Sequence, residues 1–365
     1  MGEASSDPAE HARAAARRPV GPRTYAALDL GTNNCRLLIA TRAGEGFRIV
    51  DSFSRIVRLG EGLSQSGRLS DAAMERALAA LGLCADKIAR RRAFQVKAVA
   101  THACRFADNA GEFIDRVAEC TGLRLAVISP REEARLSVAG CENLLDHDAD
   151  AALVLDVGGG STELSWLDLR RPARGARSSG ATHQGVAISA WLSIPIGVVT
   201  LAERFPEGIA PRADWYRNMV EAVKREIAAS SQAEALRPIF AAGRAYLIGT
   251  SGAITSLAGL HLGLARYDRN QVDGLWMTRG QCEATALRLG ALTAAERADQ
   301  PCIGADRADL VLAGAAILQA VQELWPCERV RVADRGLREG LLLSMMSPSR
   351  RARGPRRFAR NGASR

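Results

Sequence analysis

Apolar positions along the chain follow two spacings, those of buried strands and those of amphipathic helices. Residues 25–30 and 35–40 predict two strands joined by a tight turn, and residues 47–59 continue as β-rich sequence. Ser70 is a residue type that caps helices, and apolar residues recur at helical spacing after it to about residue 91. Predicted strands over 95–101 and 123–128 then alternate with predicted helices over 110–121 and 132–145. This alternation predicts a mixed α/β fold.

The strand–turn–strand unit at the start of the chain occurs a second time. Residues 151–157 predict an apolar strand, 158–161 a glycine turn and 162–167 a second strand. Both copies place an aspartate at the end of the first strand, Asp29 and Asp156, and a glycine two residues later. We interpret the two units as a diverged internal duplication.

The rest of the chain adds further α/β elements and one insertion. Residues 170–190 are rich in Arg, Gly, Ser and Ala and predict an exposed insertion or long hairpin loop. A third glycine turn follows a predicted strand within residues 246–253. The remaining predicted elements are helices over 214–230, 308–323 and 337–345 and a strand over 330–334.

Composition is that of a soluble globular protein of up to two ordinary domains, with 365 residues, 47% hydrophobic and 24% charged. The apolar runs are too short to predict a membrane span. The first 23 residues carry charges throughout and do not predict a secretory signal. Eight cysteines without C-x-x-C spacing are typical of a protein from a reducing cytoplasm.

The net charge of +9 belongs mostly to the two ends of the chain. Residues 1–23 and 348–365 together hold eleven arginines and three acidic residues, so these ends account for +8. Both ends are predicted to be disordered arms. Their basic charge predicts either a solubilising role or a weak attraction to polyanions such as nucleic acid.

The glycine turns suggest phosphate chemistry. Glycines let backbone N–H groups converge on phosphate oxygens, because no Cβ blocks the approach. A carboxylate at a strand end can hold a hydrated divalent cation that offsets phosphate charge. Asp29 with Gly31, and Asp156 with residues 158–160, supply both parts twice. Neither turn matches the P-loop or the dinucleotide-binding glycine motif.

The motifs and their order resemble the exopolyphosphatase / guanosine pentaphosphate phosphatase family from about residue 25 to residue 345. The resemblance rests on Asp29-Leu-Gly-Thr-Asn-Asn34, Thr101-His-Ala-Cys-Arg105, Arg131-Glu-Glu-Ala-Arg135, Asp156-Val-Gly-Gly-Gly-Ser-Thr-Glu163, Pro195-Ile-Gly-Val-Val-Thr200, Gly249-Thr-Ser-Gly252 and Leu337-Arg-Glu-Gly340. It implies two actin-like, ribonuclease H-like α/β domains with the active site in the cleft between them. The predicted organisation is an N-terminal arm over 1–23, domain I over 24–131 completed by 332–347, domain II over 132–331 and a basic tail over 348–365.

The same resemblance implies roles for individual residues. Glu133 would be the general base that activates water, and Asp156 and Glu163 would hold Mg²⁺ (or Mn²⁺) and position the water. Glu132 and Glu133 point about 100° apart on a helix, so one of them is expected to face the cleft. Arg105 would clamp a phosphate across the cleft. Backbone and side-chain groups for the phosphates would come from Asp29, Gly31, Thr32, Asn33, Gly158, Gly159, Gly160, Ser161, Gly249, Ser251 and Gly252.

Arg335 departs from the family pattern, since it stands where the family often has glycine. A side chain there can narrow the cleft or alter what enters it, so the departure bears on substrate preference. His102 follows a predicted strand, and for this histidine a structural role is favoured over a catalytic one.

Several functions stay open at this point. The first is removal of terminal phosphate from inorganic polyphosphate, and the second is removal of the 5′ γ-phosphate of guanosine pentaphosphate. The phosphate turns also occur in ATP-binding chaperones and sugar kinases of the same broad fold. A non-catalytic sensor of phosphate polymers or alarmones is a further class. A homodimer is consistent with the resemblance, and no membrane partner is predicted.

Overall fold

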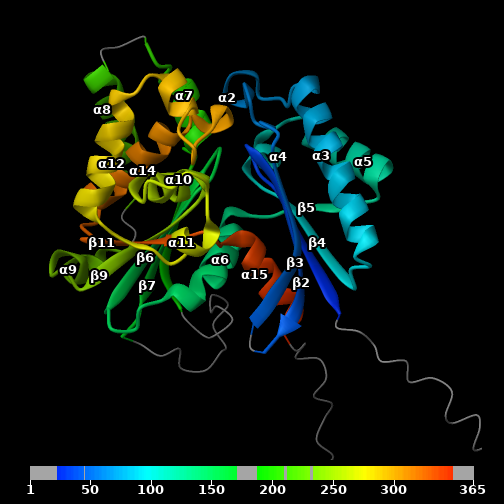
Figure 1. The fold of residues 1–365 in the computed structure, drawn as a ribbon, viewed down its shortest axis with the longest axis horizontal. Coiled ribbons are helices and arrows are strands. Elements are labelled where there is room, and N and C mark those ends of the chain that lie inside the picture. Colours follow the sequence, from blue (N-terminus) through cyan, green and yellow to red (C-terminus); the bar gives the residue numbers. More distant parts are fainter. Residues whose placement is uncertain (1–22, 45, 171–186, 209–211, 231–232, 348–365) are drawn as a thin grey trace, which may run out of the picture.

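The structure contains two separate β-sheets, each covered by helices (Figure 1). This computed structural model describes residues 23–44, 46–170, 187–208, 212–230 and 233–347. The first sheet has the strand order β3-β2-β1-β4-β5. Its strands are β1 (Thr24–Leu30), β2 (Asn34–Ala43), β3 (Gly46–Ile56), β4 (Gln95–Ala100) and β5 (Leu125–Val127).

The second sheet repeats this plan and adds a strand at one edge. Its order is β10-β11-β9-β6-β7-β8. Its strands are β6 (Ala151–Val157), β7 (Thr162–Asp168), β8 (Ile188–Ile194), β9 (Ala245–Thr250), β10 (Trp276–Thr278) and β11 (Arg329–Ala333). In both sheets an antiparallel hairpin continues into parallel strands, β1 with β4 and β6 with β9. The prediction of two actin-like α/β domains is confirmed.

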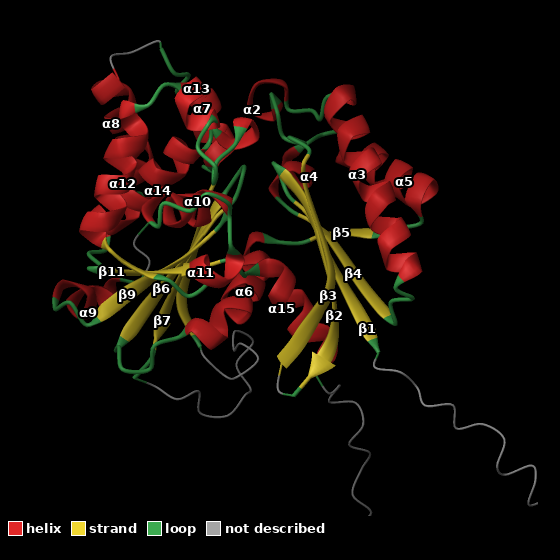
Figure 2. Cartoon of the chain, viewed as in Figure 1, coloured by secondary structure: helices red, strands yellow, loops and turns green. Residues whose placement is uncertain are grey.

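Helices connect the parallel strands, as parallel pairing requires, and cover the outer faces of the sheets (Figure 2). Ser70 caps the N-terminus of the long helix α3 by accepting from Ala73 N at 3.3 Å, as predicted. The helices are α2 (Leu63–Ser66), α3 (Asp71–Arg90), α4 (His102–Phe106), α5 (Ala110–Thr121), α6 (Pro130–Cys141), α7 (Val198–Arg204), α8 (Arg212–Ala228), α9 (Arg237–Ala241), α10 (Gly252–His261), α11 (Arg269–Val272), α12 (Arg279–Ala291), α13 (Ala294–Ala298), α14 (Val311–Leu324) and α15 (Leu337–Met346).

Some predicted elements differ from the structure. The helix expected over 132–145 ends at Cys141, where a short 3₁₀ helix over Glu142–Leu144 continues it. The strand expected over 123–128 is reduced to Leu125–Val127. Residues 1–22, 171–186 and 348–365 lie outside the described residues, so the predicted arms and most of the predicted insertion lie there too.

Helices α6 and α15 pack against each other between the two sheets (Figure 1). Leu341 and Leu342 of α15 lie in a core with Ala27 and Leu38 of the first sheet, so this last helix covers that sheet. Gly340 packs against the backbone of Leu136 in α6, where a Cβ would collide. The predicted domain boundaries at 131/132 and 331/332 fall inside α6 and β11, and they stay a prediction.

Candidate active site

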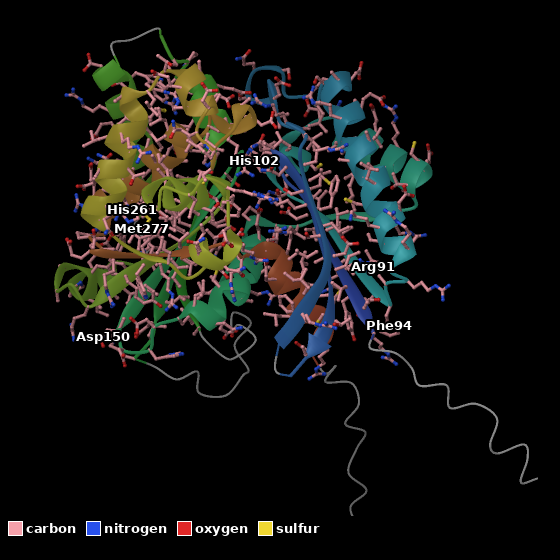
Figure 3. All side chains as sticks on the ribbon, in the orientation of Figure 1. Arg91, Phe94, His102, Asp150, His261 and Met277 are labelled. Atoms are coloured by element: carbon pink, nitrogen blue, oxygen red, sulfur yellow. The ribbon has the colours of Figure 1, made fainter. Side chains whose placement is uncertain are left out.

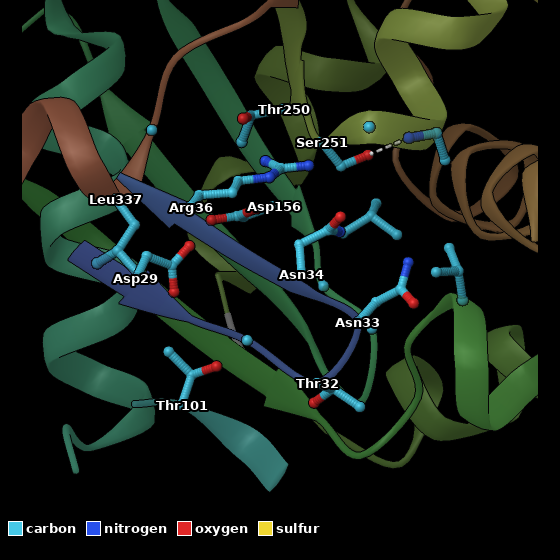
Figure 4. Close-up of a pocket in the computed structure, with 18 of the residues that line it drawn as sticks. Asp29, Thr32, Asn33, Asn34, Arg36, Thr101, Asp156, Thr250, Ser251 and Leu337 are labelled. Atoms are coloured by element: carbon cyan, nitrogen blue, oxygen red, sulfur yellow. Dashed lines mark hydrogen bonds between the residues drawn. The ribbon is translucent and has the colours of Figure 1, made fainter. Parts of the chain in front are cut away.

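We call the first sheet with its helices the first half of the structure, and the second sheet with its helices the second half. A cavity of about 130 Å³ lies between the two halves, at the ends of β1 and β6 (Figure 4). Both halves contribute to its walls, and we call this cavity the cleft. The predicted site residues that line it are Asp29, Gly31, Thr32, Asn33, Glu133, Asp156, Gly158, Gly159, Gly160, Ser161, Ser251 and Gly252. Three predicted residues, Arg105, Glu163 and Gly249, are not among its walls.

The first two glycine turns have the same local geometry and touch each other. Gly31 N donates to Asn34 O at 2.8 Å, and Gly158 N donates to Ser161 O at 2.9 Å. A Cβ on Gly159 would lie 2.9 Å from Cβ of Thr32, well inside normal contact. The glycines therefore serve the close packing of the two halves as well as leaving backbone groups accessible.

The backbone N–H groups of these turns point to anion binding. In the described part of the chain, no acceptor is found for the N–H groups of Thr32, Asn33, Gly159 and Gly160. The side-chain oxygens Thr32 Oγ1 and Asn33 Oδ1 are buried and also have no hydrogen-bond partner there. Buried polar groups are normally satisfied, so the two turns together offer an unfilled set of polar groups that face the cleft.

The third glycine turn joins β9 to α10 and differs from the other two, because a helix follows it. Ser251 has a φ of 154°, a conformation that L-residues rarely adopt, and its hydroxyl caps α10 by accepting from Ala253 N and Ile254 N, each at 3.2 Å. The N-terminus of this ten-residue helix faces the cleft, where its dipole favours anions. Gly249 instead packs inside β9 against Ile254.

Each of the first two hairpins carries a pair of charged residues directly opposite each other. Asp29 pairs with Arg36 across β1 and β2, and Asp156 pairs with Glu163 across β6 and β7. The two pairs occupy equivalent places in the duplicated unit. Arg36 and Asp156 lie close together in Figure 4, which places a cation from one hairpin beside a carboxylate from the other.

Burial raises the pKa of all three carboxyls in these pairs. Desolvation raises the pKa of Asp29 to about 6, against the opposing effect of Arg36. The pKa of Asp156 is raised by burial, although Ser137 donates a hydrogen bond to its carboxylate. Burial and two neighbouring carboxylates raise the pKa of Glu163 well above its usual range. Burial is the largest cause of the raised pKa in all three carboxyls, and a bound cation would lower these pKa values again.

Glu133 lies in the first turn of α6 and reaches the cleft, whereas Glu132 does not line it. Only 8% of Glu133 is exposed. Arg105 Nη1, on α4, donates to Glu133 Oε2 at 2.7 Å and to Ile128 O at 2.9 Å. Burial raises the pKa of Glu133 to about 7, despite the lowering effect of Arg105. The structure therefore places the Arg105 guanidinium against Glu133 and outside the cleft wall, and its expected role as a phosphate clamp stays a prediction.

Glu163 is also held away from the cleft wall. Its side chain is buried, and Ser193 Oγ donates to Glu163 Oε1 at 2.9 Å. Its place opposite Asp156 keeps the two carboxylates on one face of the sheet, since directly paired residues of antiparallel strands share a face.

Three arginines that sequence reasoning missed line the cleft: Arg36, Arg307 and Arg338. Arg36 and Arg307 approach the turn at Gly252 from opposite halves, at 3.3 Å and 4.0 Å from a Cβ built there. No ion pair is found for any of the three within the described ranges. Strand alternation could have found Arg36, because it faces Asp29 across the hairpin, whereas Arg307 follows no periodic signal.

Arg335 and His102 also line the cleft, but each is tied to a neighbour. The Arg335 guanidinium forms an ion pair with Asp273, so this side chain is drawn toward α11. The His102 ring stacks on Phe106 with 4.4 Å between centroids, and burial lowers its pKa to about 4. Figure 3 places His102 between the two halves, and its neutral ring fits the structural role favoured from sequence.

The oxygen-rich walls of the cleft fit a hydrated divalent cation. Within the described ranges, no three His, Cys, Asp or Glu side chains form a ready-made metal cluster. Mg²⁺ needs no such cluster, because it keeps several waters and is commonly held by one or two carboxylates together with substrate phosphates. Asp156 and the adjacent Glu163 supply that number of carboxylates, with raised pKa values that a cation would lower.

The fold and the cleft together define a class, that of two-domain actin-like proteins that bind phosphate groups between paired glycine turns. The model of the Ppx/GppA phosphatase family matches residues 38–349. The chain belongs to the Ppx/GppA phosphatase family.

Solved structures agree with this assignment. An exopolyphosphatase-like protein is 31% identical with a TM-score of 0.74, over 88% of this chain and 97% of that one. The Aquifex aeolicus member of the Ppx/GppA family is 28% identical with a TM-score of 0.69, again over 88% and 97%. An exopolyphosphatase from Cytophaga hutchinsonii, at 23% identity and a TM-score of 0.75 over 88% and 97%, is similar in fold.

Family membership makes this chain an exopolyphosphatase or a related phosphatase, a hydrolase of phosphoanhydrides. The family acts on polyphosphate or guanosine pentaphosphate and generally depends on divalent metal ions. None of the helices in the described ranges is both long and apolar enough to cross a bilayer.

Proposed function

We propose that this protein is an exopolyphosphatase that releases terminal phosphate from inorganic polyphosphate by attack of a carboxylate-activated water. The observation that carries the proposal is the position of Glu133. Its buried carboxylate lines the same cleft as the two glycine turns, and Arg105 Nη1 donates to it at 2.7 Å. A base needs a fixed place and a pKa near the working pH, and Glu133 has a pKa of about 7.

In the proposed step, Glu133 takes a proton from a water molecule while the water oxygen bonds to the terminal phosphorus. The bond from that phosphorus to the bridging oxygen breaks, and the shortened chain leaves with the electron pair. Phosphoryl transfer needs little more from a protein than positioning and charge stabilisation. Glu133 supplies the positioning of the water together with the acceptor for its proton.

The terminal phosphates would lie between the turns at 31–33 and 158–161. Their free N–H groups and the N-terminus of α10 would donate to phosphate oxygens. Arg36, Arg307 and Arg338 would bind the next phosphates, because guanidinium groups match phosphate geometry. This basic lining is what supports a phosphate chain as the first substrate.

Asp156 and Glu163 would hold Mg²⁺, and Mn²⁺ is an acceptable substitute for such oxygen ligands. The bound ion would offset charge on the phosphate oxygens. Asp156 lines the cleft, while Glu163 would act from the position directly opposite on β7.

The decisive variant is Glu133→Gln, which keeps the shape of the side chain and removes the base. Phosphate release from polyphosphate should fall by a factor of about 10² to 10⁴, the usual contribution of a general base, while phosphate-chain binding persists. Glu132→Gln is the matched control, because its carboxylate pairs with Arg135 outside the cleft. Turnover in Glu133→Gln equal to that of the control would remove Glu133 as the base.

Guanosine pentaphosphate is the second candidate substrate, since it would use the same catalytic groups. Release of phosphate should be measured side by side from polyphosphate and from guanosine pentaphosphate. A kcat/KM much higher on guanosine pentaphosphate would replace polyphosphate as the substrate and leave the mechanism in place. Tight binding of either molecule without turnover would instead indicate a sensor.

A further inference from the structure

The loop between β11 and α15 carries the chain back from the second sheet to the first. Its residues Asp334, Arg335 and Gly336 line the floor of the cleft, and Arg338 follows in the first turn of α15. The loop has little room, because a Cβ on Gly140 of α6 would collide with the Gly336 backbone. The position of Arg338 in the cleft is therefore set by how this loop is held.

The short helix α11 holds the loop with charged groups from its two ends. Arg269 Nη2 donates to Asp334 O at 2.6 Å and to Glu339 Oε1 at 3.1 Å. At the other end, Asp273 Oδ1 accepts from Asp334 N at 3.0 Å and from Arg335 Nε at 3.1 Å. Figure 1 shows α11 beside the start of α15, although α11 belongs to the second half.

The acidic partners in these contacts are largely shielded from water, whereas the side chains of Arg269 and Arg335 are 34% and 27% exposed. The side chain of Asp273 is 10% exposed and that of Glu339 is 4% exposed. Glu339 also caps α15, because its Oε2 accepts from Gly336 N at 2.9 Å. Shielded ion pairs of this kind are costly to break singly, since the remaining charge stays buried without a partner.

The contacts between α11 and the loop affect the position of Arg338. It lines the cleft, and it acts electrostatically on Asp29 and Arg36 of the first hairpin. It has no ion-pair partner of its own within the described ranges. Its neighbours Glu339 and Arg335 are both fixed by α11, whereas Arg338 stays available for a ligand.

We infer that Arg269 and Asp273 are positioning residues that act on phosphate binding through Arg338. They bind the loop on either side of Gly336 and so keep the first turn of α15 at the cleft. The inference rests on the proposed function only in that the ligand carries phosphate groups. The charged network would tune affinity for the phosphate chain, and neither Arg269 nor Asp273 would touch it.

The test measures binding of imidodiphosphate, a diphosphate analogue that resists hydrolysis, by calorimetry on the full chain with Mg²⁺. Arg338→Met should weaken binding about tenfold, the loss of one charge-assisted contact. Asp273→Ala should weaken it severalfold as well. The variant with both changes should bind no more than about twofold worse than Arg338→Met alone, because coupled residues are not additive.

Two further variants separate positioning from general damage to the fold. Asp214→Ala breaks an exposed ion pair with Arg217 on α8 and should leave binding unchanged. Asp273→Asn removes the charge but keeps an oxygen that can accept from Asp334 N, so this variant should lose less affinity than Asp273→Ala. Unchanged binding in Asp273→Ala, or losses that multiply in the double variant, would overturn the inference. Because binding is measured without turnover, failure of the proposed hydrolysis would be seen separately.

Discussion

Arg105 Nη1 lies 2.7 Å from Glu133 Oε2, and both side chains are nearly buried, at 12% and 11% exposed. The pair joins α4 of the first half to the start of α6. Because the guanidinium also donates to Ile128 O, it has a fixed orientation behind the carboxylate. Arg105 therefore controls both the place and the proton affinity of the proposed base.

Removal of Arg105 should raise the proton affinity of Glu133, so that a smaller fraction of this carboxyl group is ionised at neutral pH. In Arg105→Met, the loss of the cation should raise the pKa of Glu133 further above about 7. The acidic limb of the kcat/KM profile should then move to higher pH, and activity at neutral pH should fall by about tenfold or more. Arg105→Lys, which keeps the charge, should move the limb less. An unshifted limb in Arg105→Met would separate this arginine from the base.

As pH rises, deprotonation of Glu133 should increase activity and decrease the stability of the folded protein. Activity needs the ionised carboxylate, so kcat/KM should rise with pH through about 7. Because burial raises the folded-state pKa above 4.5, the folded protein binds this proton more tightly than the unfolded chain. This contribution to the free energy of unfolding is complete below about pH 4.5 and is lost as pH rises through about 7.

Denaturant unfolding of the wild type and Glu133→Gln from pH 4 to pH 8 checks the stability half of this prediction. The glutamine variant has no titrating group at this position, so its free energy of unfolding should fall less over that pH range. The difference in slope should correspond to roughly one proton. Parallel curves for the two proteins would mean that the Glu133 pKa is close to its unfolded value.

Because the turns at 31–34 and 158–161 touch each other, small substitutions there should strongly affect stability and activity. In Gly159→Ala, the new Cβ would meet Thr32 Cβ at 2.9 Å and Asn33 N at 3.0 Å, so one turn must move. We expect destabilisation of about 1–3 kcal/mol, as for other overpacked sites, and loss of most activity. Gly111→Ala is the control, because a Cβ added to Gly111 in α5 would point into open space. Thermal melts and phosphate release measure both; equal behaviour of the two variants would contradict tight packing of the turns.

Local sequence signals predicted individual elements well, whereas contacts between distant segments were not predicted. The cap at Ser70 and helical spacing predicted α3 closely, and glycine turns after apolar strands predicted both hairpins. The short elements α11 and β10 were missed, because three or four residues carry no periodic pattern. Arg105 contacts Glu133, which the sequence did not predict, and its expected role as a phosphate clamp across the cleft stays a prediction. That contact joins segments 28 residues apart, and its direction depends on how α4 packs.

Opening and closing of the cleft should depend on contacts at its mouth, away from α6 and α15. Glu203 on α7 accepts from Gly62 N at 2.9 Å and from Ser64 Oγ at 2.8 Å. Arg58 donates two hydrogen bonds to the Asp309 carboxylate, at 3.1 and 3.3 Å, and one to Asp306 O at 3.3 Å, although the side chains of Arg58 and Asp309 are 34% and 48% exposed. Glu203 and Arg58 therefore both link the two halves in the described structure.

Glu203→Ala should shift the free protein toward an open form, because both hydrogen bonds across the mouth are lost. Small-angle scattering should give a larger radius of gyration than for the wild type without ligand, and the two should converge once polyphosphate and Mg²⁺ are added. KM should rise severalfold with a smaller change in kcat, since part of the binding energy now closes the cleft. Glu75→Ala, which breaks an exposed pair with Arg116 far from the mouth, should change neither quantity. Identical scattering of Glu203→Ala and the wild type would show that these contacts do not hold the cleft closed.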